Sequence, residues 1–278
     1  MPSEQEDLFL DTPSNPSMRG DRALMEFPFF SLSKTPRREP IMYDDGRVSI
    51  KVSPGERGIA TIWDKDVLIY VTSLLNAQIE RGLTPSRTVA FAASDFLRVA
   101  DRGTSGRAYS QFKDALFRLR STTITTTISA AGEQEDRGFG WIDSWRLIRR
   151  TGQKGGKITE AVEVTLNDWM YRAILRERRV LSMDQEYFSL SMALERRIYE
   201  LVRKHLGQQD SWAIMLPRLA EKIGTERDLR KLRAELNQII KKDSLIRYRM
   251  QLELPAGMKR VTANRIKVVF SHRLAICG

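Results

Sequence analysis

Residue types that commonly build catalytic and metal sites are scarce in this chain of 278 residues. Its single cysteine, Cys277, excludes an internal disulfide framework and fits a reducing cytosol. The only histidines, His205 and His272, have no neighbour at a metal-ligand spacing, so no metal site is expected. No nucleotide-binding motif is found either. These absences predict a binding protein without cofactors rather than an enzyme.

Long apolar runs are also missing. Every hydrophobic stretch is far shorter than the roughly 18 residues that indicate a membrane-spanning helix. The N-terminus is acidic, whereas a secretory signal begins with basic residues. We therefore expect a cytoplasmic protein with no membrane partner.

Positive charge is present in excess and is unevenly distributed. The net charge is +11, and residues 191–278 contain 19 Lys and Arg against 9 Asp and Glu. Residues 1–20, by contrast, contain four acidic residues and one basic residue. A basic excess that is concentrated in one part of a chain favours a polyanionic partner such as DNA.

Residues 216–242 are expected to form two helices joined by a tight turn. Leu219, Ala220 and Ile223 share one face of the first helix, and Gly224 is typical of a helix C-terminus. Thr225 is expected to cap the second helix. The outer face of that helix offers cations and an amide that suit a DNA major groove: Arg227, Arg230, Lys231, Gln238 and Lys241.

A charged outer face is more often simply solvated, so the segments that follow this helix decide between the two interpretations. Residues 246–254 and 265–271 alternate with the period of a strand and flank a turn or loop at 255–260. With a helix expected at 191–206, the order is that of a winged helix. Basic residues of the hairpin are expected to neutralise phosphates: Arg247, Arg249, Lys259 and Arg260.

The preceding part of the chain shows a similar order of expected elements. They are a strand hairpin at 48–62, helices at 63–81, 96–100 and 107–120, strands at 122–129, 141–148 and 161–166, and a helix near 167–176. The fold class is therefore predicted as α+β, with two tandem winged-helix domains at 41–180 and 181–278. Residues 1–40 hold most of the prolines and are predicted to be a flexible tail and linker, in which the aromatic run 25–32 docks on the folded body.

The first domain has a less basic helix than the second. Arg107, Lys113 and Arg118 are candidates for contacts with the DNA backbone, and dimerisation is an equally good use of that domain. We expect a balance between monomer and dimer.

The acidic tail contains a possible docking peptide. Gln5 is followed by the adjacent pair Leu8 and Phe9, and this pattern resembles the peptide by which bacterial replication proteins bind the sliding clamp. The two apolar side chains would fill a pocket while the Gln5 amide fixes the register by hydrogen bonds.

Longer runs carry a resemblance to a known family, the plasmid replication initiator protein A family of bacteria. They are the segments 27–34, 58–70, 138–145, 163–169 and 194–205. The resemblance implies a protein that binds repeated sites in its plasmid origin as duplex DNA. It also implies recruitment of host replication proteins, such as the clamp and a helicase or initiator, and a fold with two winged helices.

Three other functions stay open at this point. One is an architectural or partition-type interaction protein, which sequence-independent footprints on DNA would support. Another is a transcriptional repressor built from the same winged helices, which would have no use for a clamp peptide. The third is a single-stranded DNA-binding replication protein, because some members of the family are described in that way.

Overall fold

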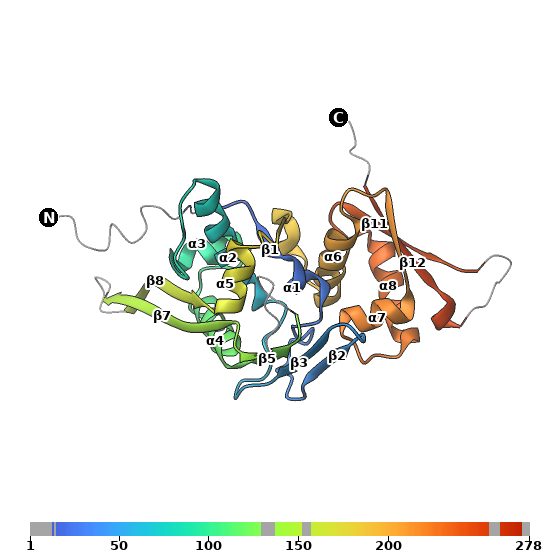
Figure 1. Ribbon diagram of the computed structural model, residues 1–278, viewed down its shortest axis with the longest axis horizontal. Helices are drawn as coiled ribbons and strands as arrows, with labels where there is room; N and C mark the ends of the chain where they lie inside the picture. Colours follow the sequence, from blue (N-terminus) through green and yellow to red (C-terminus); the bar gives the residue numbers. More distant parts are fainter. Residues whose placement is uncertain (1–12, 14, 129–136, 152–156, 256–261, 274–278) are drawn as a thin grey trace. The chain divides into compact units, whose positions relative to one another are not determined.

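The computed structural model describes residues 13, 15–128, 137–151, 157–255 and 262–273 (Figure 1). The chain is a mixed α and β protein, as the sequence predicted. It forms two compact units: unit 1 contains Met1–Asp21 and Phe29–Ser189, and unit 2 contains Arg22–Pro28 and Leu190–Gly278. The later division lies a little beyond the expected boundary at residue 180. We call Arg22–Pro28 the N-terminal insert, because it belongs to unit 2 although both of its flanks belong to unit 1.

Unit 2 packs helices against one face of a three-stranded antiparallel sheet. The order along the chain is α6 (Ala193–Leu206), β10 (Ser211–Met215), α7 (Leu216–Ile223), α8 (Leu229–Lys242), β11 (Tyr248–Glu253) and β12 (Lys267–His272). The sheet order is β10-β12-β11, so the last strand is central and pairs with both others. Two smaller elements complete the unit, α1 (Arg22–Glu26) in the insert and the 3-10 turn η2 (Ala263–Arg265).

The helices and the final hairpin of unit 2 were predicted, whereas β10 was not. The strand has only five residues, and its sequence, Ser-Trp-Ala-Ile-Met, does not alternate polar and apolar residues. In the sheet, Trp212 of β10 pairs with Phe270 of β12, and the two rings stack with centroids 5.3 Å apart. Pairing with a distant strand, rather than local sequence, therefore defines this element.

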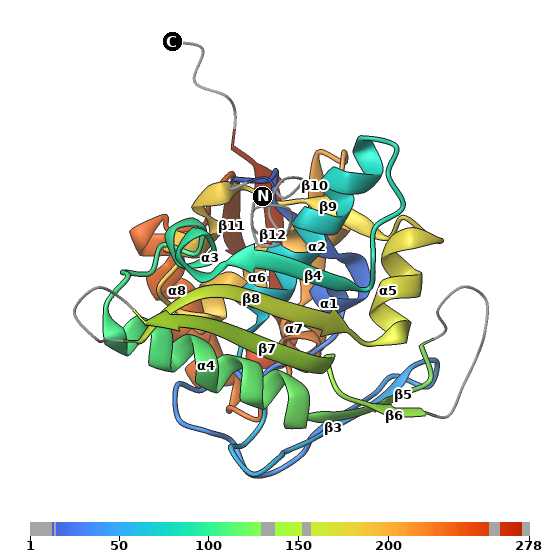
Figure 2. The same cartoon turned by 90° about the vertical axis from the view of Figure 1, so that its left-hand side faces the viewer.

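Unit 1 repeats the same order of elements. It runs through α2 (Lys65–Glu80), β4 (Thr88–Ala92), α3 (Ala93–Val99), α4 (Gly106–Ser121), β7 (Ile142–Thr151) and β8 (Lys157–Leu166). The sheet order is β4-β8-β7, so the last strand is again central. Figure 2 shows these three strands side by side, with α4 running along β7. The two units thus share one topology, in which the first strand of the sheet pairs with the strand that comes last in the sequence.

A second sheet is inserted into unit 1. Strands β2 (Ile41–Asp44), β3 (Ser49–Ser53), β5 (Thr123–Thr126) and β6 (Arg137–Phe139) form an antiparallel sheet in that order. The predicted hairpin of 48–52 with 58–62 is wrong, because β3 pairs with β2 instead. The turn at Asp45-Gly46 explains the difference: Gly46 has a φ of +79°, and the Asp45 carboxylate accepts from the backbone N–H groups of Arg47 and Val48.

Much of the stretch from residue 18 to residue 31 is folded rather than tail or linker. β1 (Arg19–Asp21) pairs with β9 (Val180–Ser182), ahead of the 3-10 turn η1 (Gln185–Ser189). Trp141 has no exposed surface, and its ring lies 5.2 Å from that of Phe29 and 5.0 Å from that of Phe30. These aromatic residues belong to the core of unit 1, which is why the docked run stood out in the sequence.

Helix α2 crosses the core of unit 1 and begins with buried carboxylates. Asp64 accepts hydrogen bonds from Nε and Nη2 of Arg118 at 2.7 and 2.8 Å, and Asp66 accepts from Nη2 of Arg102 at 2.8 Å. The hydrogen bond to Asp64 raises the pKa of Arg118 above its ordinary value. Arg118 therefore turns inward and does not supply the surface cation that the sequence suggested. Helix α5 (Asp168–Leu175) was predicted and is capped by Asn167, which accepts from the backbone N–H of Met170 at 2.8 Å.

We expect Arg118→Leu to lower the free energy of unfolding by about 3 kcal/mol, because it leaves the buried Asp64 carboxylate without its partner. Urea unfolding of the full chain measures this change. Arg146→Leu is the matched control, since it breaks an exposed pair with Glu163 and should leave stability nearly unchanged. Equal losses for the two variants would contradict the assignment of Arg118 to the core.

Candidate nucleic-acid interface

The helix pair of unit 2 meets at a tight turn that needs a glycine. Gly224 has a φ of +76°, and its backbone N–H donates to the carbonyl of Ala220 at 3.0 Å. Thr225 does not cap α8, contrary to expectation. The cap is Asp228, whose carboxylate accepts from the backbone N–H of Arg230 at 2.8 Å, while Thr225 Oγ1 accepts from that of Arg227 at 3.2 Å. Arg227 consequently precedes the helix instead of lying within it.

One side of α8 is buried and the other forms a continuous exposed stripe. Leu232, Leu236 and Ile239 are buried against the rest of unit 2. Six of the exposed residues of α8 recur at helical spacing, and we call them the α8 stripe: Arg230, Lys231, Ala234, Asn237, Gln238 and Lys241. Sequence reasoning missed Ala234 and Asn237, because it searched for charge although their spacing already placed them on this face. Ala234 matters because its small side chain permits close approach to a groove.

Some cations in and near the α8 stripe form ion pairs within the protein, and others do not. Arg227 forms an ion pair with Glu235, and the Arg230 guanidinium, 89% exposed, lies 3.8 Å from Asp228. Among the residues that the structure describes, no hydrogen bond or ion pair engages the side chains of Lys231, Asn237, Gln238 or Lys241. The stripe is therefore available to bind a ligand.

The hairpin after α8 supplies further cations. Arg247 and Arg249 are exposed as predicted, while Lys259 and Arg260 lie outside the described residues. Arg265 and Lys267 are also exposed and were not predicted; Lys267 lies 3.6 Å from the carboxylate of Glu253. No motif in the sequence marked Arg265 as a candidate for DNA contact. It was recognised only because the structure places it just before the central strand β12.

One arginine fixes the connection between α8 and β11. Arg273 donates to the carbonyls of Asp243, Leu245 and Tyr248 at 2.6 to 3.2 Å, and it pairs with the Asp243 carboxylate at 2.8 Å. Asp243 and Arg247 both adopt positive φ values, +48° and +61°, so this connection is strained and needs such a partner. Arg273 therefore helps set the position of the hairpin relative to α8.

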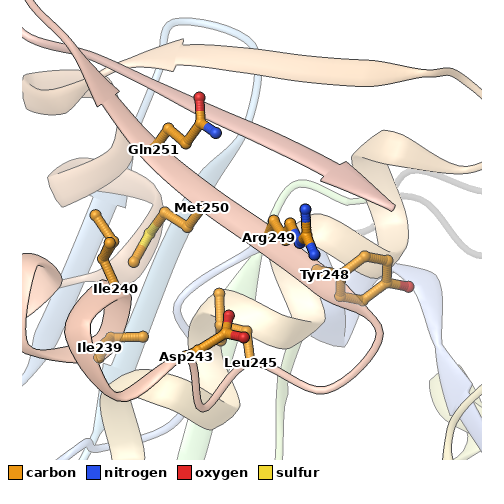
Figure 3. Close-up of a pocket in the computed structure, with 8 residues that line it drawn as sticks. All are labelled: Ile239, Ile240, Asp243, Leu245, Tyr248, Arg249, Met250 and Gln251. Carbon is orange, nitrogen blue, oxygen red and sulfur yellow. The ribbon is translucent and has the colours of Figure 1, made fainter. Parts of the chain in front are cut away.

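A cavity of about 170 Å³ lies at the same connection (Figure 3). Both apolar residues, among them Ile239 and Met250, and the polar residues Asp243, Arg249 and Gln251 line it. It is smaller than the roughly 300–1,000 Å³ that is usual for small-molecule sites. We attribute it to imperfect packing at the joint between helix and hairpin.

A partly buried charge cluster lies beside α7. The Glu26 carboxylate contacts the ammonium groups of Lys204 and Lys222; burial raises its pKa, but these two cations outweigh burial and bring the pKa below its ordinary value. Burial lowers the pKa of Lys222. Burial, aided by the neighbouring lysines, also lowers the pKa of His205 to about 4, so its ring is neutral at pH 7 and its 3.9 Å approach to Glu26 is not an ion pair.

The equivalent helix of unit 1, α4, is less suited to DNA. Arg107 is exposed, but Lys113 is half-buried with its ammonium 5.7 Å from the ring of Phe117. Asp114 adds a negative charge and pairs with Arg57. The proposed clamp-binding residues, Gln5, Leu8 and Phe9, lie outside the described residues.

Neither a metal site nor a membrane span is found in the described part of the chain. No group of three or more His, Cys, Asp or Glu residues there is arranged to hold a metal ion. No helix within the same residues is long and apolar enough to cross a bilayer.

Comparison with known proteins identifies the family. The model of the family described as replication initiator protein A matches residues 19–250. This chain belongs to that family. The resemblance seen in the sequence is confirmed, and the family is one of replication initiators. A protein of Wigglesworthia glossinidia brevipalpis, provisionally described as a replication protein, is 35% identical over 251 residues, which cover 88% of this chain and 90% of that protein.

Solved structures of two other proteins share the fold. Domains 2 and 3 of RctB match with a TM-score of 0.66 and 13% identity, over 91% of this chain and 98% of theirs. The Pi initiator protein, solved in complex with iteron DNA, matches with a TM-score of 0.50 and 17% identity, over 77% of this chain and 92% of that one. At such low identity these matches establish a common fold and nothing finer.

We expect Arg273→Ala to lower the free energy of unfolding by about 2 kcal/mol, because three carbonyls in the α8–β11 connection lose their donor. Urea unfolding measures the change. Asp243→Asn is the control: it removes only the ion pair and keeps a residue that tolerates positive φ, so it should cost less than about 1 kcal/mol. If the control lost as much as Arg273→Ala, the carbonyl contacts would not be the important ones.

Proposed function

We propose that this initiator binds repeated duplex sites in a plasmid origin through two tandem winged-helix domains and recruits host replication proteins there. The shared order of the units supports the domain assignment. In each, a helix and a strand precede a helix pair and a final hairpin, as in a winged helix. The related fold of the Pi initiator, solved with iteron DNA, supports repeated sites as the target.

The α8 stripe carries the proposal. An α-helix fits the major groove, where arginine and lysine can bind guanine and asparagine and glutamine can bind adenine. In the stripe, Arg230, Lys231 and Lys241 are available to bind guanine, and Asn237 and Gln238 are available to bind adenine. Ala234 between them leaves room for the helix to approach the base edges.

The other basic residues have less specific roles in this proposal. Arg247, Arg249 and Arg265, with Lys259 and Arg260, neutralise phosphates next to the groove. In unit 1, Arg107 and Lys113 contact the DNA backbone or border a dimer interface, and Arg118 is omitted because it is bound to Asp64. A monomer–dimer equilibrium then adjusts how many repeats are occupied.

Asn237→Ala and Arg230→Ala should each weaken binding to the origin repeat by about 1–3 kcal/mol and leave binding to random DNA nearly unchanged, because they remove contacts to bases. Footprinting on DNA adjoining the gene identifies the repeat, and fluorescence anisotropy then measures both affinities. Gln208→Ala removes an exposed amide outside the stripe and should change neither affinity. Equal losses of affinity for the origin repeat and for random DNA would show that α8 does not contact bases.

Arg249→Ala should weaken binding to all DNA by a similar factor, because it removes a contact to phosphate. The slope of log affinity against log salt should fall by about 1. A titration from about 50 to 200 mM salt measures the slope. A loss confined to the origin repeat would instead place Arg249 on a base edge.

Replacing Leu8 and Phe9 together by Ala should abolish plasmid replication while origin binding stays within about twofold, because these residues are proposed to fill the clamp pocket and not to contact DNA. Plasmid maintenance, clamp binding by surface plasmon resonance and origin affinity are the three measurements. The pair Ser3→Ala and Asp11→Ala, outside the peptide, is the control. Normal replication by the Leu8 and Phe9 variant would show that the proposed clamp peptide is not needed for replication.

A further inference from the structure

The N-terminal insert, Arg22–Pro28, is part of the packing of unit 2. Its helix α1 packs against α6, and Ala23, Leu24 and Met25 are buried. The residues on either side of the insert, Asp21 and Phe29, belong to unit 1. The C-terminal unit is therefore completed by a segment that precedes most of unit 1 in the sequence.

Arg197 of α6 joins the insert to α7, the first helix of the α7–α8 pair. Its guanidinium is buried, with 4% of the side chain exposed. Nη1 donates to the carbonyl of Met25 at 2.8 Å, and Nη2 donates to those of Glu26 at 2.9 Å and Lys222 at 2.6 Å. These carbonyls lie at the C-terminal ends of α1 and α7, where a helix has no partners of its own for them. One planar group thus holds two helix ends together.

The end of the insert then lies on the turn between α7 and α8. The Glu26 carboxylate accepts from Lys222 Nζ at 3.2 Å, and the same ammonium lies 5.6 Å from the ring centroid of Phe27. Pro28 packs so closely on Gly224 that a Cβ at that glycine would collide with the proline ring. The turn that determines where α8 starts is therefore covered by residues 26–28.

We propose that the N-terminal insert is a positioning element for DNA reading, and that Arg197 and Glu26 are the positioning residues through which it holds the α7–α8 turn. This inference rests on the proposed function, because it concerns the geometry in which the α8 stripe meets DNA. Neither residue needs to touch DNA. A fragment beginning at Leu190 would lack the insert and would present α8 less accurately.

Arg197→Lys and Glu26→Gln test the proposal in the full chain. Lysine keeps the charge but cannot donate to three carbonyls in the fork geometry of arginine. Without DNA, amide hydrogen exchange should rise together in residues 22–28 and 216–228. The dissociation constant for the origin repeat should rise about tenfold, and the salt slope should not change, because no phosphate contact is lost.

Arg196→Lys is the matched control. Arg196 is the adjacent buried arginine of α6, and its Nε donates to the carbonyl of Leu190 at 2.7 Å. Its replacement should not raise exchange in residues 22–28 and 216–228 together. Glu26→Gln, a milder change near the surface, keeps the test valid if Arg197→Lys does not fold.

The outcomes distinguish a failure of this proposal from a failure of the proposal that the α8 stripe contacts DNA bases. If either variant raises exchange in 22–28 but leaves 216–228 protected and the repeat affinity unchanged, the insert is only packing and the proposal is overturned. Arg230→Ala should weaken repeat binding without any change in exchange. If Arg230→Ala left repeat binding intact while Arg197→Lys still loosened both segments and weakened binding, the reading face would fail and the positioning role would stand.

Discussion

Helix ends that are buried need hydrogen-bond donors, and in unit 2 a single guanidinium supplies them to two helices. Arg197 satisfies carbonyls of α1 and α7 at 2.6 to 2.9 Å. The close contact of Pro28 with Gly224 and the salt bridges of Glu26 follow from the arrangement that it fixes. Without this donor, burying the insert would leave backbone oxygens unsatisfied, at a cost of about 1–3 kcal/mol each. The C-terminal end of α7 is therefore held by a residue that lies in neither α7 nor α8.

The second helix of the helix pair places its cations differently in the two units. In unit 1, Arg118 and Arg102 turn inward and neutralise Asp64 and Asp66 at the start of α2. In unit 2, α8, the equivalent of α4, turns Arg230, Lys231 and Lys241 outward, and its buried face is entirely aliphatic. The same order of helices and strands thus turns Arg118 of α4 into the core of unit 1 and turns the cations of α8 to the surface of unit 2, although α6 of unit 2 also buries an ion pair, Arg197 with Glu200. This contrast is why we assign sequence reading to unit 2.

Much of the fold could be predicted because its signals are local. The apolar spacing of Leu219, Ala220 and Ile223 predicted α7, and Gly224 predicted its end. Strands β4 and β10 were missed, since five weakly patterned residues become a strand only when a distant partner pairs with them. The candidate site was predicted in the same uneven way: Arg230, Lys231, Gln238 and Lys241 are exposed as expected, whereas Arg118 is not. Helical periodicity predicts on which side of a helix a residue lies. It does not predict whether a buried carboxylate, such as Asp64 beside Arg118, draws that residue into the core.

The amino-acid sequence by itself determined the basic character of the C-terminal part, the helix pair at 216–242 and the membership of a replication initiator family, because charge, short-range periodicity and long matching runs are properties of the chain. Only the tertiary structure decided that Arg22–Pro28 completes unit 2 and that Arg118 belongs to the core. Both depend on contacts between residues more than fifty positions apart, which helical periodicity does not encode.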